Sequence, residues 1–156
     1  MQEATLCFPV EDGAVLLIEK KRGLGAGKLN GPGGKLEGGE TPAEAARREV
    51  REEIRTGVPE VTKLGELAFE MGGEPLMFVH VFRAPGVDGE PAETPEAKPV
   101  WYPIDAVPYD EMWPDDRYWL PHVFAGERFA GSFVFGDSED DLLEWELDVG
   151  VSFGEG

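Results

Sequence analysis

The chain has 156 residues, enough for one domain with a hydrophobic core, and we expect a single domain over residues 1–156. Its 41% hydrophobic and 29% charged residues are typical of globular rather than disordered proteins. The formal net charge of −18 at pH 7 repels nucleic-acid polymers and argues against a DNA- or RNA-binding module.

Several further classes are disfavoured. No run of about eighteen apolar residues is present, so no membrane span is expected. The start Met1-Gln2-Glu3 lacks the basic and apolar regions of a secretion signal, and the single cysteine, Cys7, cannot form an internal disulfide. We therefore expect a cytoplasmic protein in which Cys7 is a buried apolar residue. We also expect it to be a monomer. The spread of acids suggests adaptation to a salty cytoplasm; an ordinary acidic protein is the alternative.

The first elements are two strands, Thr5 to Val10 and Val15 to Glu19, joined by a turn at Glu11-Asp12-Gly13. A glycine-rich loop follows from Lys20 to Asn30. From Lys20 to Lys35 there are five basic residues and no acidic one, which favours a site that receives a polyphosphate. A plain solvated loop is the alternative. The turn Gly31-Pro32-Gly33-Gly34 is expected to use positive φ and to approach a ligand closely.

A helix begins next, with Thr41 as N-cap, Pro42 at its first position and Glu44 at capping-box spacing. Gly57 is the expected stop. Three apolar residues four apart predict a buried stripe: Ala46, Val50 and Ile54.

The same helix carries three glutamates on one side, Glu49, Glu52 and Glu53. Their mutual repulsion is relieved by a hard cation with oxygen ligands, and Mg²⁺ commonly sits between carboxylates and substrate phosphates. Glu40 in the preceding turn can join this site. Three arginines are expected to hold the glutamates by charge-assisted hydrogen bonds: Arg47, Arg48 and Arg51. The alternative is a salt-bridged, solvated surface helix.

The second half of the chain predicts strands at Val61 to Phe69, Leu76 to Arg83 and Val100 to Pro103. A turn at Met71-Gly72-Gly73-Glu74 separates the first two, and the proline-rich segment Ala84 to Lys98 is expected to be a surface loop.

Met112 to Pro121 contains Trp-Pro-Asp-Asp, in which the two acids can simply cap the following helix. Pro121 is expected to kink that helix or mark a later start. A hairpin over Arg128 to Phe135 and Leu142 to Val149 ends the chain. The isolated His80 and His122 are interpreted as structural, which leaves no histidine-based triad or zinc site.

Strands around one central helix, with a second helix near the end, predict an α/β sandwich with a mixed sheet. The segment of Gly34, Glu40 and Arg48-Glu49-Val50-Arg51-Glu52-Glu53 resembles the Nudix box of the Nudix hydrolases. That resemblance implies the α/β/α architecture. It departs at Arg55, where the family has a glycine.

Two further segments, Lys20 to Thr41 and Met112 to Trp119, resemble the oxidised-purine nucleoside triphosphatases of that family (8-oxo-dGTP and 2-hydroxy-dATP diphosphatases). The resemblance implies a base pocket read by Asn30, Asp115 and Asp116. An amide offers donors and acceptors, and one of two adjacent buried carboxyls keeps a proton, so the set can meet a keto or an amino edge.

The resemblance also assigns the rest of the site. Trp113 and Phe69 are the aromatics flanking the base, although without the family resemblance both would be interpreted as core residues. Thr5 matches a hydrogen-bonding position, whereas Leu24 replaces an aromatic and suggests a looser pocket floor. Lys35, or the segment Lys20 to Arg22, is expected to contact phosphate, and Lys20 and Lys35 are taken as substrate-binding residues. The implied metal set comprises Gly34, Glu40, Glu49, Glu52, Glu53 and Glu96, the last otherwise an exposed loop glutamate.

We therefore expect a Mg²⁺-dependent hydrolase, with Mn²⁺ as substitute, that converts modified purine (deoxy)nucleoside triphosphates to monophosphate and pyrophosphate. The catalytic residues would be Glu49, Glu52, Glu53 and Arg48, with Glu53 as base. One alternative is a Nudix hydrolase of an ordinary nucleoside triphosphate or of another nucleoside diphosphate derivative. The others are a non-catalytic nucleotide-binding module and a purely structural acidic protein.

Overall fold

The computed structural model describes residues 2–153, so Met1 and residues 154–156 of the expected domain lie outside it. The strands are β1 (Glu3–Glu11), β2 (Ala14–Lys20), β3 (Leu29–Asn30), β4 (Gly33–Lys35), β5 (Thr62–Met71), β6 (Glu74–Ala84), β7 (Ala97–Pro103), β8 (Phe129–Phe135) and β9 (Leu142–Val149). The helices are α1 (Pro42–Ile54), the 3₁₀ turn η1 (Tyr109–Glu111) and α2 (Asp116–Ala125). No helix among these residues is long and apolar enough to cross a lipid bilayer.

The strands form one sheet in the order β3-β2-β1-β6-β5-β8-β9, with β4 beside β1 and β7 beside β2. The β1–β6 and β5–β8 pairs are parallel and the other pairs are antiparallel, so the sheet is mixed as predicted. Strand β1 is central because it pairs with β6 along most of its length, with β4 over Ala4 to Leu6 and with β2 at its end.

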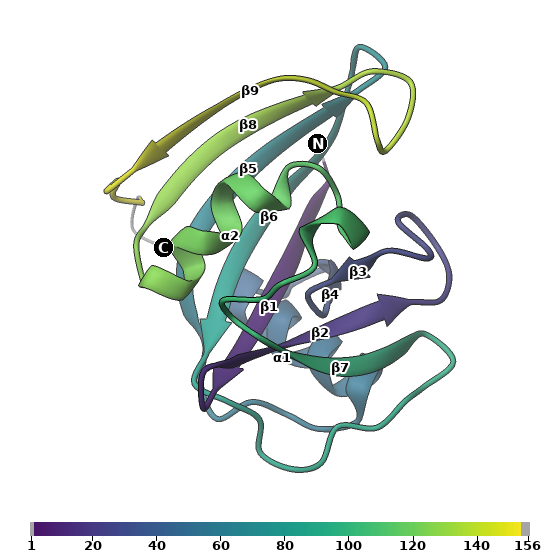
Figure 1. The fold of residues 1–156 in the computed structure, drawn as a ribbon, viewed down its shortest axis with the longest axis vertical. Coiled ribbons are helices and arrows are strands. Elements are labelled where there is room, and N and C mark those ends of the chain that lie inside the picture. Colours follow the sequence, from purple (N-terminus) through teal and green to yellow (C-terminus); the bar gives the residue numbers. More distant parts are fainter. Residues whose placement is uncertain (1, 154–156) are drawn as a thin grey trace.

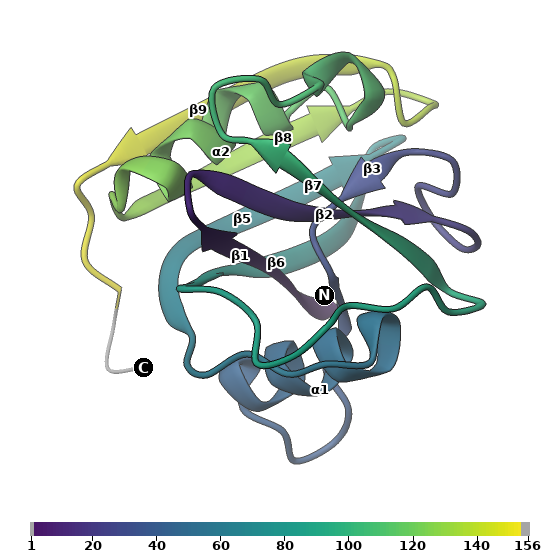
Figure 2. The ribbon, with the colours of Figure 1, turned by 60° about the horizontal axis from the view of Figure 1, so that its bottom comes forward.

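The two helices cover opposite faces of the sheet, and Figure 2 shows the strands between them. Alternation along β1 explains this arrangement: Cys7 points into the apolar cluster under α1, whereas Phe8 points into the cluster under α2. The predicted stripe of α1, Ala46, Val50 and Ile54, is completely buried. The α/β/α sandwich is confirmed, and burial raises the pKa of the Cys7 thiol to about 12.

The start of α1 is confirmed. Thr41 accepts a hydrogen bond from the backbone of Glu44, and the Glu44 side chain accepts one from the Thr41 backbone. Its end is not at Gly57, as predicted, but at Arg55, which adopts the left-handed conformation with φ of 60°. The Arg55 amide still donates to the Arg51 carbonyl, and the left-handed backbone at Arg55 then turns the chain out of the helix. The departure from the family's glycine therefore falls at the residue that needs positive φ.

The predicted strands and hairpins are present, with three local corrections. The segment Lys20 to Asn30 is not all loop, because Leu29–Asn30 pairs with β2 as β3. Pro121 does not mark a later helix start, since α2 runs through it from Asp116. Asp115 is the N-cap residue of α2 but makes no side-chain capping bond, so capping does not account for this acidic pair.

Candidate active site

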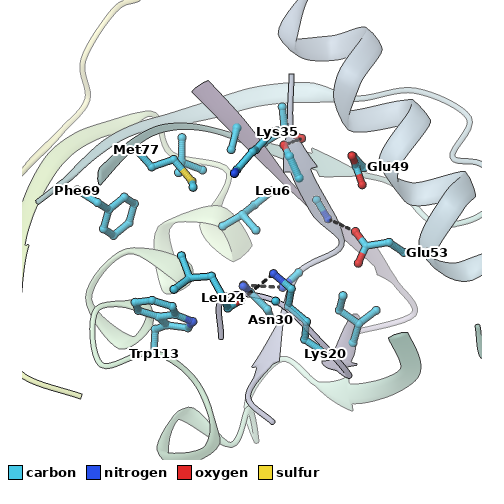
Figure 3. A pocket seen from close by; sticks show the side chains of 18 of the residues that line it. Leu6, Lys20, Leu24, Asn30, Lys35, Glu49, Glu53, Phe69, Met77 and Trp113 are labelled. Atoms are coloured by element: carbon cyan, nitrogen blue, oxygen red, sulfur yellow. Dashed lines mark hydrogen bonds between the residues drawn. The ribbon is translucent and has the colours of Figure 1, made fainter. Parts of the chain in front are cut away.

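A single cavity of about 750 Å³ brings most of the predicted site together on the sheet between α1 and the segment before α2 (Figure 3). Its polar end is formed by α1 and the β3–β4 segment, and its aromatic end by β5, β6 and residues 113–119. The lining includes fourteen of the predicted residues: Thr5, Lys20, Leu24, Asn30, Gly34, Lys35, Glu49, Glu52, Glu53, Phe69, Glu96, Trp113, Asp115 and Asp116.

Arg48 organises the carboxylates at the polar end. Its Nε donates to Glu40 Oε2 at 2.6 Å, and its Nη1 donates to Glu49 Oε1 at 2.8 Å and Glu52 Oε1 at 3.2 Å. Its Nη2 also binds the Lys35 carbonyl, which ties α1 to β4. Arg48 does not itself line the cavity, so its predicted role is carried by the carboxylates that it holds.

The other predicted arginine partners are not observed. Among residues 2–153, neither Arg47 nor Arg51 makes an ion pair with the box glutamates. The Arg48 hydrogen bond lowers the pKa of Glu40, and burial raises the pKa of Glu49. Arg48 therefore neutralises much of the carboxylate repulsion that the sequence indicated.

Glu53 is the buried member of the glutamate set. Its Oε1 accepts from the Gly33 amide at 2.8 Å, and burial, opposed by that bond, raises its pKa to about 8. Neighbouring Glu49 and Glu96 raise it further, whereas Lys20 lowers it. A carboxyl that holds a proton near neutral pH is suited to general acid–base work.

The glycines beside this cluster permit close packing rather than positive φ, contrary to the prediction. Gly31, Gly33 and Gly34 all have negative or extended φ, and Gly33 and Gly34 lie in β4. A Cβ on Gly34 would stand 2.5 Å from the Glu49 carboxyl carbon, and one on Gly33 would collide with the Thr5 carbonyl. Only glycine at 34 leaves the Glu49 carboxylate in place.

The donor set suits a hard divalent cation. Glu49, Glu52 and Glu53 present oxygen ligands at one end of the cavity, beside a glycine whose missing Cβ leaves the space. Among the described residues, no three metal-ligating side chains are already gathered into a coordination cluster. The oxygen donors are of the kind that such an ion prefers, and the ion would take Glu49 and Glu52 from their hydrogen bonds with Arg48.

The base end is dominated by two buried acids. Asp115 and Asp116 are only 2% and 3% exposed, and Asp115 Oδ1 and Asp116 Oδ2 have no hydrogen-bond partner within the described part of the chain. Burial raises the pKa of Asp115 to about 6, and burial together with the Asp115 charge raises the pKa of Asp116 well above its usual value. Buried polar atoms without a partner are rare, and these two line the cavity.

The remaining predicted base contacts surround this pair. Asn30 Oδ1 accepts from the Gly31 amide at 2.9 Å, which leaves its NH₂ group for a ligand. Trp113 packs edge-on against Phe135, with ring centroids 5.6 Å apart, and Phe69 lies opposite on β5 (Figure 3). Thr5, on β1, is buried. Leu24 is 42% exposed, so it lies at the rim rather than on the floor.

The basic segment is largely neutralised by acids from elsewhere in the chain. Lys21 pairs with Glu93, Lys28 with Asp140 and Arg22 with Glu96. Glu96 lines the cavity as predicted for a metal ligand, but its carboxylate is paired with Arg22. Lys20 and Lys35 line the same cavity, and neither forms an ion pair with a carboxylate of residues 2–153.

Sequence reasoning missed several lining residues. Leu6, Leu76, Met77 and Val79 form an apolar wall, Gln2 also lines the cavity, and Trp119 closes the base end. Trp119 was detectable, because it stands four residues after Asp115 on the expected helix and so faces the same way. The others carry no local signal beyond strand alternation.

Comparison with known proteins agrees with this geometry. The NUDIX domain family model matches residues 1–123, which include the glycine turn, the carboxylate helix and Asp115 and Asp116. The chain belongs to the Nudix family.

This Nudix chain has close relatives with defined names. It is 48% identical over 145 residues to the oxidized purine nucleoside triphosphate hydrolase of Danio rerio, and 43% identical over 144 residues to that of Mus musculus. Each match covers 92% of both chains. Among solved structures it resembles the MutT protein of Bacillus halodurans, with a TM-score of 0.83 and 30% identity over 95% of this chain and 98% of that one. This structural likeness covers the whole sandwich. Nudix hydrolases generally use divalent metal ions, which agrees with the oxygen ligands on α1.

Proposed function

We propose that the chain hydrolyses oxidised purine (deoxy)nucleoside triphosphates to the monophosphate and pyrophosphate. One observation carries the proposal: Asp115 and Asp116, each with a buried oxygen that has no partner among the described residues, line the same cavity as the carboxylates of α1. The names of the zebrafish and mouse relatives support the substrate class. A purine at the aromatic end places its phosphates toward Glu49, Glu52 and Glu53.

Base recognition rests on proton placement. Two adjacent buried carboxyls do not both ionise at neutral pH, so the pair holds a proton and presents one donor and several acceptors. Together with the NH₂ group of Asn30, this set pairs with the edge of a modified purine. Trp113 and Phe69 supply aromatic faces, and each stack contributes on the order of 1–3 kcal/mol.

At the polar end, Glu49, Glu52 and Glu53 would hold Mg²⁺, with Gly34 and Glu40 beside them and Mn²⁺ as a substitute. When bound, Mg²⁺ supplies charge neutralisation for the polyphosphate and a more acidic water. Lys20 and Lys35 bind phosphate oxygens.

The hydrolytic step has a simple balance. Water oxygen bonds to the phosphorus on one side of the α–β bridge, and the bridging oxygen leaves with the other phosphorus. Glu53 in its ionised form takes the water proton at Oε2, because its Oε1 is engaged by the Gly33 amide. Arg48 keeps Glu40, Glu49 and Glu52 oriented for this step.

Two matched variants separate base reading from hydrolysis. Asp115→Asn should lower the preference for oxidised over normal purine triphosphates at least about tenfold while hydrolysis persists. Glu52→Gln, at a side chain 55% exposed, should leave the preference intact and lower turnover of every triphosphate. Unchanged preference in Asp115→Asn would contradict the assignment of the base end.

The chain's setting is also a proposal. The single buried thiol suits a reducing cytoplasm, and a formal charge of −18 opposes self-association, which supports a monomer. Full stability in dilute low-salt buffer would exclude the hypothesis of salt adaptation.

A further inference from the structure

The turn between β8 and β9 holds the glycine-rich loop between β2 and β3. Glu139 Oε2 accepts from the Gly25 amide at 3.0 Å, and Asp140 Oδ1 accepts from Lys28 Nζ at 2.7 Å. These partners are more than a hundred residues apart in sequence, yet Figures 1 and 2 both show the turn and the loop side by side. We name Glu139 and Asp140 the acidic clasp.

The loop that the clasp holds is a wall of the cavity. Leu24 lies at the rim near Trp113 (Figure 3), and Gly25 packs so closely that an added Cβ would stand 2.7 Å from the Trp113 indole nitrogen. On the inner side, Lys20 Nζ donates to the Leu24 carbonyl at 2.7 Å. The position of this loop therefore sets the space between Leu24, Trp113 and the rest of the base end.

The loop is closed by its own bonds, from the Gly27 amide to the Lys20 carbonyl and from Lys20 Nζ to the Leu24 carbonyl, but its seating on the rest of the molecule needs contacts from outside. Gly23, Gly25 and Gly27 have φ of 84°, 82° and 89°, a conformation that glycine adopts freely and that costs chain entropy to fix. Among the described residues, Glu139 is the one side chain from outside Lys20–Lys35 that hydrogen-bonds to the backbone of Gly23–Gly27. Glu139 is partly buried, so solvent screens its contact with the Gly25 amide less than an ordinary surface contact. Asp140 is 78% exposed, so its pair with Lys28 is a surface pair and the weaker half of the clasp.

We propose that the acidic clasp positions the glycine-rich loop against Trp113 and so sets the selectivity of the base pocket. This inference rests on the proposed function and assigns to it two positioning residues on a distant hairpin, neither of which lines the cavity. Because the carboxylate end of the cavity lies on α1, loosening the loop changes base affinity rather than the hydrolytic step.

The test uses the double variant Glu139→Ala/Asp140→Ala. The readouts are the dissociation constants of 8-oxo-dGMP and dGMP without metal, and kcat and KM for the two triphosphates with metal. We expect the selectivity between the monophosphates to fall at least about fivefold and KM for the oxidised triphosphate to rise, with kcat nearly unchanged. Glu139→Gln should retain most of the selectivity, because it keeps an acceptor for the Gly25 amide.

Asp137→Asn is the matched control. It removes one charge from the same exposed turn, and no hydrogen bond or ion pair links Asp137 to the loop among the described residues. A lower melting temperature with unchanged selectivity in the double variant would overturn the inference, as would equal loss in Asp137→Asn. A wild-type chain without any preference for 8-oxo-dGMP would instead remove the proposed function.

Discussion

Trp119 and Asp115 are joined within α2 by a hydrogen bond of 2.7 Å from the indole Nε1 to Oδ2 of the carboxyl. The bond fixes the carboxyl so that its other oxygen, Oδ1, remains without a partner at the cavity. Trp119 is itself completely buried, packed between Phe8 and Phe129. Trp119, a residue of the core, thus orients the carboxyl of Asp115, a residue of the base pocket.

Trp119→Phe tests this relationship. Phenylalanine keeps the aromatic packing but leaves Asp115 Oδ2 without its donor, so the free energy of unfolding should fall by about 1–3 kcal/mol at neutral pH. The pKa of Asp115 should rise, because the indole bond lowers it. Chemical denaturation measures the first effect, and Trp145→Phe, at a partly exposed indole, is the control. Equal losses in both variants would count against the bond.

The Asp115–Asp116 pair should weaken the unliganded fold at neutral pH. Both folded-state pKa values lie above the ordinary value of 3.8, with Asp115 at about 6, so the folded chain binds more protons than the unfolded chain above pH 4. Stability from this pair is present at low pH and is lost as pH rises through 6.

Asp116→Asn removes most of this dependence of the free energy of unfolding on pH, and it should stabilise the chain by on the order of 2 kcal/mol at pH 7. Near pH 3.5 the variant and the wild type should be equally stable. Denaturant titrations across this range measure the difference, with Asp137→Asn as the exposed control. A wild-type stability that rises from pH 4 to 6 relative to Asp116→Asn would contradict the assignment.

Gly33 and Gly34 should respond differently to the same substitution. Gly34→Ala pushes only the flexible end of Glu49, so the chain should fold with little loss of stability while turnover falls roughly ten- to hundredfold. Gly33→Ala meets the Thr5 backbone at 1.9 Å and should lower the free energy of unfolding by about 3 kcal/mol or more. Thermal unfolding and turnover of both proteins decide; full activity in Gly34→Ala would contradict the placement of Glu49.

Arg55→Gly should stabilise the chain. Arg55 holds φ of 60° without a helix-ending glycine, a strain of about 1 kcal/mol for a residue with a side chain. Its relief should raise the melting temperature by about 2–4 °C. Gly57→Ala serves as comparison and should give no such gain, since its Cβ would press on Arg51 and Asp88.

The parts of the molecule that were predictable are those whose causes are local. The capping box of Thr41 and Glu44, the buried stripe ending at Ile54, and the hairpin turns all depend on residues within a few positions of one another. Most residues assigned to the site by resemblance line one cavity, because the segments that carry them match the motifs of the family.

What could not be predicted depends on contacts between distant segments. The Arg22–Glu96 pair and the Gly25–Glu139 bond join residues far apart in sequence, and no local pattern marks either partner. The end of α1 at Arg55 was missed for a related reason: the left-handed position is set by the chain's path after the helix, which overrides residue preference.

The most direct test of the central claim is pyrophosphate release from 8-oxo-dGTP and 2-hydroxy-dATP beside dGTP and dATP, with Mg²⁺ at low and high salt. The account predicts that kcat/KM for the oxidised purines exceeds that for the normal ones at least about tenfold. Equal cleavage of all four would contradict the base pocket built on Asp115 and Asp116. Cleavage of none, at either salt, would contradict the hydrolytic site on α1.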